Sequence, residues 1–159
     1  MLEQLVGQSI DRYQLVELLG EGGMGAVFRG RDITLQRDVA IKVMQPQAAR
    51  LPNFQERFLN EARTAARLDH PGIVKVFDFG QASGYLYIVM ELLRGDNLRK
   101  LLEGLQGSGK TLSLVEAVQI VRQICLALDY AHQQGVLHRD IKPDNIMLKP
   151  EPGEGLAFR

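Results

Sequence analysis

The feature that most constrains the fold is a glycine-rich segment near the start of the chain, followed directly by a short β-type run. Gly20, Gly22 and Gly25 form the pattern G-x-G-x-x-G, and Val27 stands two residues further on. A dinucleotide-binding turn would need a helix directly after these glycines. Here the run from Ala26 to Gly30 is short and β-rich, so the segment predicts a strand–turn–strand hairpin. Its backbone N–H groups could approach a phosphate without obstruction by Cβ atoms. On this motif alone, an ordinary glycine-rich hairpin with no phosphate-binding role is also an open interpretation.

The next apolar strand pattern carries one lysine. Residues Val39 to Met44 read V-A-I-K-V-M, with Lys42 as their only charged residue. A lone lysine in a strand normally faces solvent, whereas a lysine that binds phosphate needs a carboxylate to hold it in place. A helix predicted over 54–68 supplies Glu61 at the edge of its apolar stripe.

An acid, a lysine and an amide lie close together in the run from His138 to Asn145. The three residues are Asp140, Lys142 and Asn145. They suit phosphoryl transfer, because they offer a base for a hydroxyl proton, a cation for a phosphate and an oxygen ligand for Mg²⁺. The alternative is a solvated, proline-containing loop after a helix, and the order of the motifs upstream argues against it.

With these motifs in this order, the chain resembles the protein kinase superfamily over essentially residues 10–150. The lysine at position 142, two residues after Asp140, is the mark of the Ser/Thr branch. The string Gly-Glu-Gly-Gly-Met-Gly-Ala-Val-Phe looks like the eukaryotic-like Ser/Thr kinases of bacteria. Ile141 stands where the usual pattern has leucine, which is a conservative apolar change.

The resemblance implies an α+β, protein-kinase-like fold. Residues 10–93 would form a five-stranded antiparallel small lobe with one main helix and the start of the hinge. Residues 94–159 would form an incomplete, mostly helical large lobe, with its first helices and the catalytic loop. The D-F-G metal site and the activation segment that the family shows next are not in this sequence. We therefore expect the 159-residue chain alone to lack useful activity.

The resemblance also implies the cofactors and the roles of the site residues. ATP would bind with Mg²⁺, or with Mn²⁺ in its place, and the acceptor would be a Ser or Thr hydroxyl of a protein substrate. Asp140 would accept the hydroxyl proton, Lys142 would stabilise the γ-phosphoryl group, and Asn145 would bind the metal. Lys42, held by Glu61, would bind the α- and β-phosphates. The other implied ATP-binding residues are Leu19, Gly20, Gly22, Gly25, Val27, Ala40, Met90, Glu91, Leu93 and Met147.

The one D-F-G string in this sequence lies far upstream of the catalytic run. Asp78 follows a predicted strand over 73–77 and precedes a turn and a second strand, Tyr85 to Met90. This order is that of a hairpin in the small lobe. We therefore do not assign Asp78 to metal binding. His138 is likewise expected to pack beneath the catalytic loop and not to act as a catalyst.

Two capping boxes are predicted at helix starts. Asn53 with Glu56 would begin the helix over 54–68, and Ser113 with Glu116 would begin a long helix that ends at Gly135. The long helix carries an apolar stripe that, in the family, packs against helices absent from this sequence. The stripe consists of Val118, Val121, Cys125 and Leu128, and Cys125 is expected to be a buried core thiol.

Composition excludes several functional classes. Lys plus Arg and Asp plus Glu both number 19, so no basic arm is available for nucleic acid or an anionic membrane. The single cysteine excludes an intrachain disulfide. No apolar run reaches transmembrane length, and the N-terminus lacks the basic start of a signal peptide, so a cytoplasmic protein is expected.

Two other functions compete with a Ser/Thr kinase. One is a non-catalytic kinase-like module that binds nucleotide or a partner. The other is a small-molecule phosphotransferase of related fold, which the residues Arg139 and Lys142 disfavour. The sequence downstream of Arg159 would separate the first alternative from an active kinase, since a D-F-G string there would favour catalysis.

Overall fold

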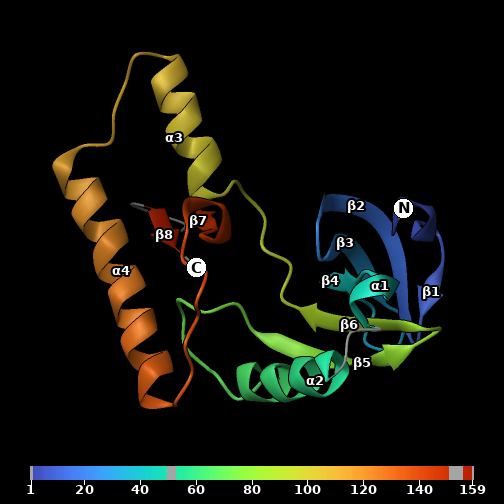
Figure 1. The fold of residues 1–159 in the computed structure, drawn as a ribbon. Helices are drawn as coiled ribbons and strands as arrows, with labels where there is room; N and C mark the ends of the chain where they lie inside the picture. The colour runs from blue at the N-terminus through green and yellow to red at the C-terminus, as the bar shows by residue number, and fades with distance from the viewer. Residues whose placement is uncertain (1, 50–52, 151–155, 159) are drawn as a thin grey trace. The chain divides into compact units, whose positions relative to one another are not determined.

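The computed structural model describes residues 2–49, 53–150 and 156–158 (Figure 1). The chain divides into two compact units. The first comprises Met1–Arg67 and Lys75–Leu92, and the second comprises Leu68–Val74 and Leu93–Arg159.

The first unit is built on a six-stranded antiparallel sheet, one strand more than predicted. The additional strand has only two residues, too few to give an alternating pattern. It pairs Ser9 with Gln14 and Ile10 with Tyr13. The strand order is β1-β2-β3-β4-β6-β5. The strands are β1 (Ser9–Ile10), β2 (Tyr13–Gly22), β3 (Gly25–Asp32), β4 (Arg37–Met44), β5 (Val76–Ala82) and β6 (Tyr85–Met90).

Alternation along these strands gives the sheet two different faces. Phe28, Ile41 and Val89 belong to the main core, which fills one face. A short 3-10 turn, η1 (Leu2–Leu5), adds its two leucines to the same core, although the sequence did not predict it. On the other face of the sheet, Met44, Leu86 and Ile88 pack against helix α2.

Helix α2 (Phe54–Ala65) ends three residues before the predicted end at residue 68, and it buries Phe58 and Ala62. The predicted capping box at its start is wrong. Asn53 adopts a left-handed backbone with φ of 59°, and its side chain makes no capping hydrogen bond. An N-cap residue normally has an extended backbone, which lets its side chain accept from the first turn. A short helix, α1 (Pro46–Ala49), precedes α2.

The second unit contains two helices and the segment that follows them. Helix α3 (Leu98–Gly107) begins at Asn97, whose side chain accepts a hydrogen bond from the Lys100 N–H. Helix α4 (Leu114–Gln133) begins with the predicted capping box of Ser113 and Glu116. A 3-10 turn, η2 (Pro143–Asn145), precedes a two-stranded sheet of β7 (Leu148–Pro150) and β8 (Leu156–Phe158). The core of this unit consists of Leu98, Ile120, Ile146 and Leu148.

Helix α4 leaves Val118 and Val121 of its apolar stripe uncovered, as expected for a stripe that packs, in the family, against helices absent from this sequence. Ile120, Ala127 and Ala131 are its buried residues. Val118 and Val121 are 56% and 58% exposed. Cys125 is exposed as well, so the prediction of a buried core thiol is wrong. Within residues 2–49, 53–150 and 156–158, no helix combines the length and the apolar character that crossing a membrane requires.

Candidate functional site

The glycine-rich segment forms the predicted strand–turn–strand hairpin. Strands β2 and β3 pair in antiparallel register up to Gly22 and Gly25, which face each other beside the turn. A Cβ atom on Gly25 would lie 2.3 Å from the Val43 carbonyl oxygen. Any larger residue there would push the hairpin away from β4, so the close approach requires glycine.

Four of the predicted ATP-binding residues share one face of the sheet. Val27 pairs with Lys42 across β3 and β4, and Ala40 pairs with Met90 across β4 and β6. Directly paired residues point to the same side of a sheet, and so do residues two apart in one strand. Lys42 is therefore aligned with the apolar side chains expected to cover an adenine ring. Leu19 lies in β2 and is half exposed.

The predicted pairing of Lys42 with Glu61 is not formed in the structure. Lys42 is half-buried on β4, whereas Glu61 is exposed on α2 beside the buried Ala62. Neither residue belongs to any ion pair within 4.0 Å in the described part of the chain. The pairing in a nucleotide-bound state stays a prediction.

The second unit brings the three predicted catalytic residues together. The Asn145 Nδ2 group donates to the Asp140 Oδ2 atom at 3.0 Å and to the Asp140 carbonyl oxygen at 2.9 Å. The Lys142 Nζ atom lies 3.1 Å from the same Asp140 Oδ2. Hydrogen bonds from Lys142 and then Asn145 hold the pKa of the exposed Asp140 carboxyl below its ordinary value. Asp140 is therefore a stable carboxylate, accessible from solvent.

Local backbone geometry shapes this loop. Arg139 has a left-handed φ of 62° immediately before Asp140. The Asp140 N–H donates to the His138 Nδ1 atom at 3.3 Å, and His138 is exposed. The prediction that His138 packs beneath the loop is therefore wrong. Its ring instead accepts a bond from the backbone of the loop.

Sequence reasoning missed the residues that join the loop to α3. The Arg99 guanidinium lies 3.3 Å from the Asp144 carboxylate. The Leu98 N–H donates to the Ile146 carbonyl at 2.8 Å, and Asn97 forms an isolated bridge with Met147. These contacts link positions almost fifty residues apart, so no local motif could have indicated them. They fix the segment after Asp140 on the start of α3.

The residues predicted to form the hinge lie where the chain passes from the first unit to the second. Met90 ends β6, and the Glu91 N–H donates to the Lys75 carbonyl at 2.9 Å. Leu92 closes the first unit and Leu93 belongs to the second. Hydrogen bonds from this segment to adenine stay a prediction.

The upstream D-F-G string has a structural role. Asp78 lies inside β5, not after a strand as predicted. Its Oδ2 atom accepts a hydrogen bond from the Tyr13 hydroxyl at 2.6 Å. The same atom forms an ion pair with the Arg12 guanidinium at 3.2 Å. Both contacts are made within the first unit, and the expectation that Asp78 binds no metal stays a prediction.

A metal would find one suitable ligand among the catalytic residues. Asn145 uses its amide nitrogen on Asp140, so its amide oxygen is the atom that it can offer to a cation. In the described part of the chain, no three His, Cys, Asp or Glu side chains gather to hold a metal. Mg²⁺ commonly binds through few protein ligands together with phosphate oxygens. Asn145 fits Mg²⁺ as one such ligand beside a bound triphosphate.

Comparison with known proteins decides the family. The family described as "Protein kinase domain" matches residues 13–156. The chain belongs to the protein kinase family. Its curated relatives include the serine/threonine-protein kinase PknB of Mycobacterium leprae. That relative is 46% identical over 142 residues, which are 87% of this chain and 22% of the relative. Serine/threonine-protein kinase PknD of Mycobacterium tuberculosis is 43% identical over 143 residues, or 90% of this chain and 21% of that protein.

Solved kinase structures share the fold. The crystal structure of the Mycobacterium tuberculosis PknI kinase domain matches with a TM-score of 0.79 at 36% sequence identity. The match covers 90% of this chain and 57% of that kinase domain. The protein-kinase-like fold, the Ser/Thr character of the relatives and their bacterial origin are therefore confirmed. The chain spans only the front part of a kinase domain and about a fifth of its curated relatives' length, 22% and 21% in the two relatives above.

Proposed function

We propose that this chain is the nucleotide-binding and catalytic-loop part of a Ser/Thr protein kinase, which transfers the γ-phosphoryl group of ATP to a Ser or Thr hydroxyl. One observation carries the proposal: Lys142 and Asn145 converge on a single Asp140 oxygen, at 3.1 Å and 3.0 Å. Under this proposal residues 10–93 hold the nucleotide, and residues 94–159 supply the catalytic loop of an incomplete large lobe.

The geometry of the loop supports a role for each residue. Asp140 is ionised at neutral pH, so it can accept a hydrogen bond from a substrate hydroxyl and take its proton. Phosphoryl transfer passes through a loose transition state, in which the acceptor needs orientation more than a strong base. A lowered pKa therefore does not disqualify Asp140. The Lys142 ammonium lies beside Asp140, where charge would develop on the transferred group.

The first unit would contribute nucleotide binding. Backbone N–H groups of the Gly20–Gly25 hairpin would face the phosphates, and Lys42 would neutralise their charge. Val27 and Ala40 would cover the adenine, with Met90 at the end of β6. Bound Mg²⁺ would neutralise phosphate charge, with the amide oxygen of Asn145 as one ligand.

A second candidate is a kinase-like module that binds nucleotide or a partner without catalysis. The separation of Lys42 and Glu61 favours it, because an active kinase needs this ion pair in place. We expect the 159-residue chain alone to turn over far more slowly than the ~1 per second at the low end of kinase rates.

Calorimetric titration of the chain with ATP and Mg²⁺ tests the proposal. We expect saturable binding that weakens strongly in Lys42→Met, because the methionine keeps the length of the side chain and removes its charge. Asp140→Asn should bind ATP almost as the unmodified chain does, since Asp140 is assigned to the acceptor hydroxyl. Absence of ATP binding by the unmodified chain, or equal binding by Lys42→Met, would contradict the assignment.

A further inference from the structure

The glycine-rich hairpin carries one charged side chain, Glu21, whose contacts the kinase motifs do not explain. The Glu21 Oε1 atom accepts a hydrogen bond from the Leu2 N–H at 3.3 Å and from the Gln45 Nε2 group at 3.4 Å. Leu2 belongs to the N-terminal turn η1, and Gln45 directly follows β4. One carboxylate oxygen thus connects the hairpin to two different segments.

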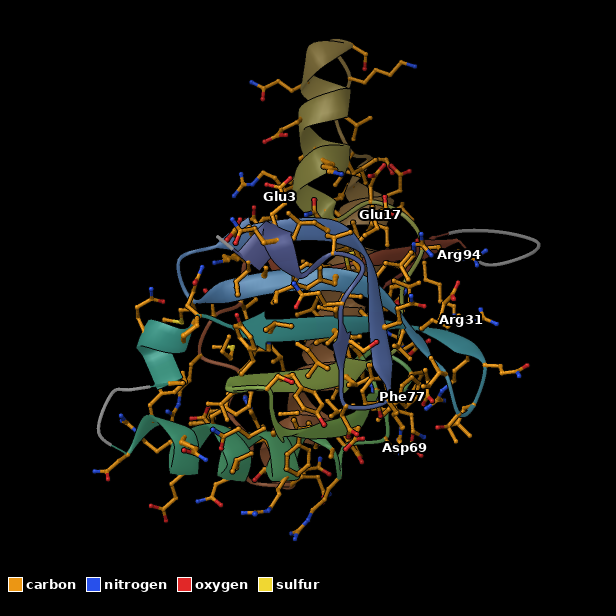
Figure 2. The ribbon with its side chains drawn as sticks, turned by 90° about the vertical axis from the view of Figure 1, so that its right-hand side faces the viewer. Glu3, Glu17, Arg31, Asp69, Phe77 and Arg94 are labelled. Atoms are coloured by element: carbon orange, nitrogen blue, oxygen red, sulfur yellow. The ribbon has the colours of Figure 1, made fainter. Side chains whose placement is uncertain are left out.

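The N-terminal turn η1, which provides one of these contacts, is itself held in place by core packing. Leu2 and Leu5 are only 3% and 6% exposed and lie in the main core of the first unit. Two further bonds tie the following residues to β2: Gly7 N–H donates to the Leu15 carbonyl, and Leu15 N–H donates to the Gln8 carbonyl, both at 2.8 Å. Figure 2 shows the turn, with Glu3 labelled, beside β2 and β3, which it contacts.

Gln45 forms the second anchor, and it contacts both sides of the hairpin tip. Its backbone N–H donates to the Met24 carbonyl at 3.0 Å, while its side chain reaches Glu21. Gly25, next to Met24, already approaches the Val43 carbonyl so closely that no Cβ would fit. The β3 side of the tip is therefore fixed on β4, and Glu21 is the residue that ties the β2 side.

We propose that Glu21 is a positioning residue for the nucleotide: it ties the glycine-rich hairpin to the N-terminal turn and to Gln45, and so presets the hairpin for the triphosphate. The inference rests on the proposed ATP binding. Glycine-rich backbone loses much conformational freedom when it is ordered, so a hairpin ordered in advance binds with a smaller entropic cost. The Gln45 contact is exposed and the Leu2 contact is partly buried, so each is modest alone. The effect therefore depends on both acting together.

Amide hydrogen exchange of residues 19–25, measured by mass spectrometry without nucleotide, tests the tie directly. In Glu21→Ala we expect exchange to become about fivefold faster, because a segment that loses one or two weak bonds opens more often. Glu21→Gln should stay close to the unmodified chain, since its amide oxygen can still accept. Glu17→Ala is the matched control, because Glu17 lies on the same strand but pairs with Arg29, at 2.9 Å.

Two exchange results would overturn the proposal. The first is a Glu21→Ala hairpin that exchanges no faster than that of Glu17→Ala. The second is a Glu21→Gln hairpin that exchanges as fast as that of Glu21→Ala. Gln45→Leu supplies an independent arm, since it removes only the side-chain donor and keeps the bond from the Gln45 backbone. It should accelerate exchange in the same peptide, and an unchanged rate would exclude Gln45 as an anchor.

Titration of the same variants with ATP and Mg²⁺ tests the consequence for the nucleotide. We expect the Kd of Glu21→Ala to rise about three- to tenfold, with Glu21→Gln and Glu17→Ala near the original value. Faster exchange with an unchanged Kd in Glu21→Ala would refute the role in nucleotide positioning. If no chain binds ATP, including the unmodified one, the proposed function fails, and the exchange data still decide whether Glu21 orders the hairpin.

Discussion

Tyr13 donates its hydroxyl hydrogen bond to the Asp78 carboxylate at 2.6 Å and thereby connects β2 with β5. These strands are not neighbours in the sheet, since β3, β4 and β6 lie between them. The sheet is therefore curled, and the bond ties two distant strands together. Arg12 adds an ion pair to the same carboxylate and places its guanidinium over the Tyr13 ring. Burial and then the bond to Asp78 raise the pKa of the Tyr13 hydroxyl.

Tyr13→Phe should destabilise the first unit by about 1.5–3 kcal/mol, the range for a hydrogen bond to a charged group. The phenyl ring keeps the packing, so the loss reports the bond between β2 and β5. Urea unfolding, monitored by circular dichroism, measures this loss of unfolding free energy. Val16→Ala, at an exposed position on the same strand, serves as the control and should cost much less. Equal losses in both variants would show that the Tyr13–Asp78 bond adds no stability.

The local part of the fold was predictable from the sequence. The hairpin at Gly22 and Gly25, the strand that carries Lys42 and the capping box at Ser113 all depend on residues close together in the chain. The role of Asp78 was not predictable, because its partner Tyr13 is 65 positions away. Tyr13 gives no local signal that distinguishes it from any other tyrosine in a strand.

The predictions about helices that were wrong or missing also have physical explanations. Asn53 has the right residue type for a cap, but a left-handed backbone prevents its side chain from capping. On α4 the buried face contains Ile120 and Ala127, so Cys125, which belongs to the uncovered stripe, is exposed and not a core thiol. The two leucines of η1 form too short a pattern to indicate that they complete the core of the first unit.

The α4 surface gives a second stability prediction. Val118→Lys should change the free energy of unfolding by less than about 0.5 kcal/mol, as expected for an exposed site. Ile120→Ala should cost about 2–5 kcal/mol, because Ile120 is 3% exposed and truncation leaves a cavity. Denaturant titration of both variants measures their free energies of unfolding. At a concentration low enough to keep the chain monomeric, comparable losses would contradict the exposure of Val118 in the folded chain.

We expect copies of the chain to associate through the same exposed α4 surface. Val118 and Val121 together expose apolar area that Val118→Lys interrupts with a charge. We expect sedimentation velocity to show less self-association for Val118→Lys than for the unmodified chain at equal concentration. An unchanged distribution would indicate that this stripe does not mediate association.

The catalytic loop gives a pH prediction. The pKa of Asp140 lies below its ordinary value of 3.8, because Lys142 and Asn145 donate hydrogen bonds to the ionised form. The ionised form is favoured in the folded state, so this contribution is present above pH 3.8 and is lost as pH falls through the lower native pKa. Carbon NMR of the Asp140 carboxyl during acid titration measures it. Lys142→Met should raise the pKa toward 3.8, and no change would show that Lys142 does not contact Asp140 in solution.

Transfer of labelled phosphate from ATP to a Ser/Thr protein substrate, by the full-length product of the gene, tests the central claim most directly. Asp140→Asn should lower kcat by at least about a hundredfold, the usual scale for loss of a positioned general base, and leave the KM for ATP nearly unchanged. Asp78→Asn serves as the comparison. Asp78 bonds to Tyr13, so this variant should keep most of the activity once folded. Full activity in Asp140→Asn, or a loss confined to Asp78→Asn in folded protein, would contradict the assignment of the catalytic loop.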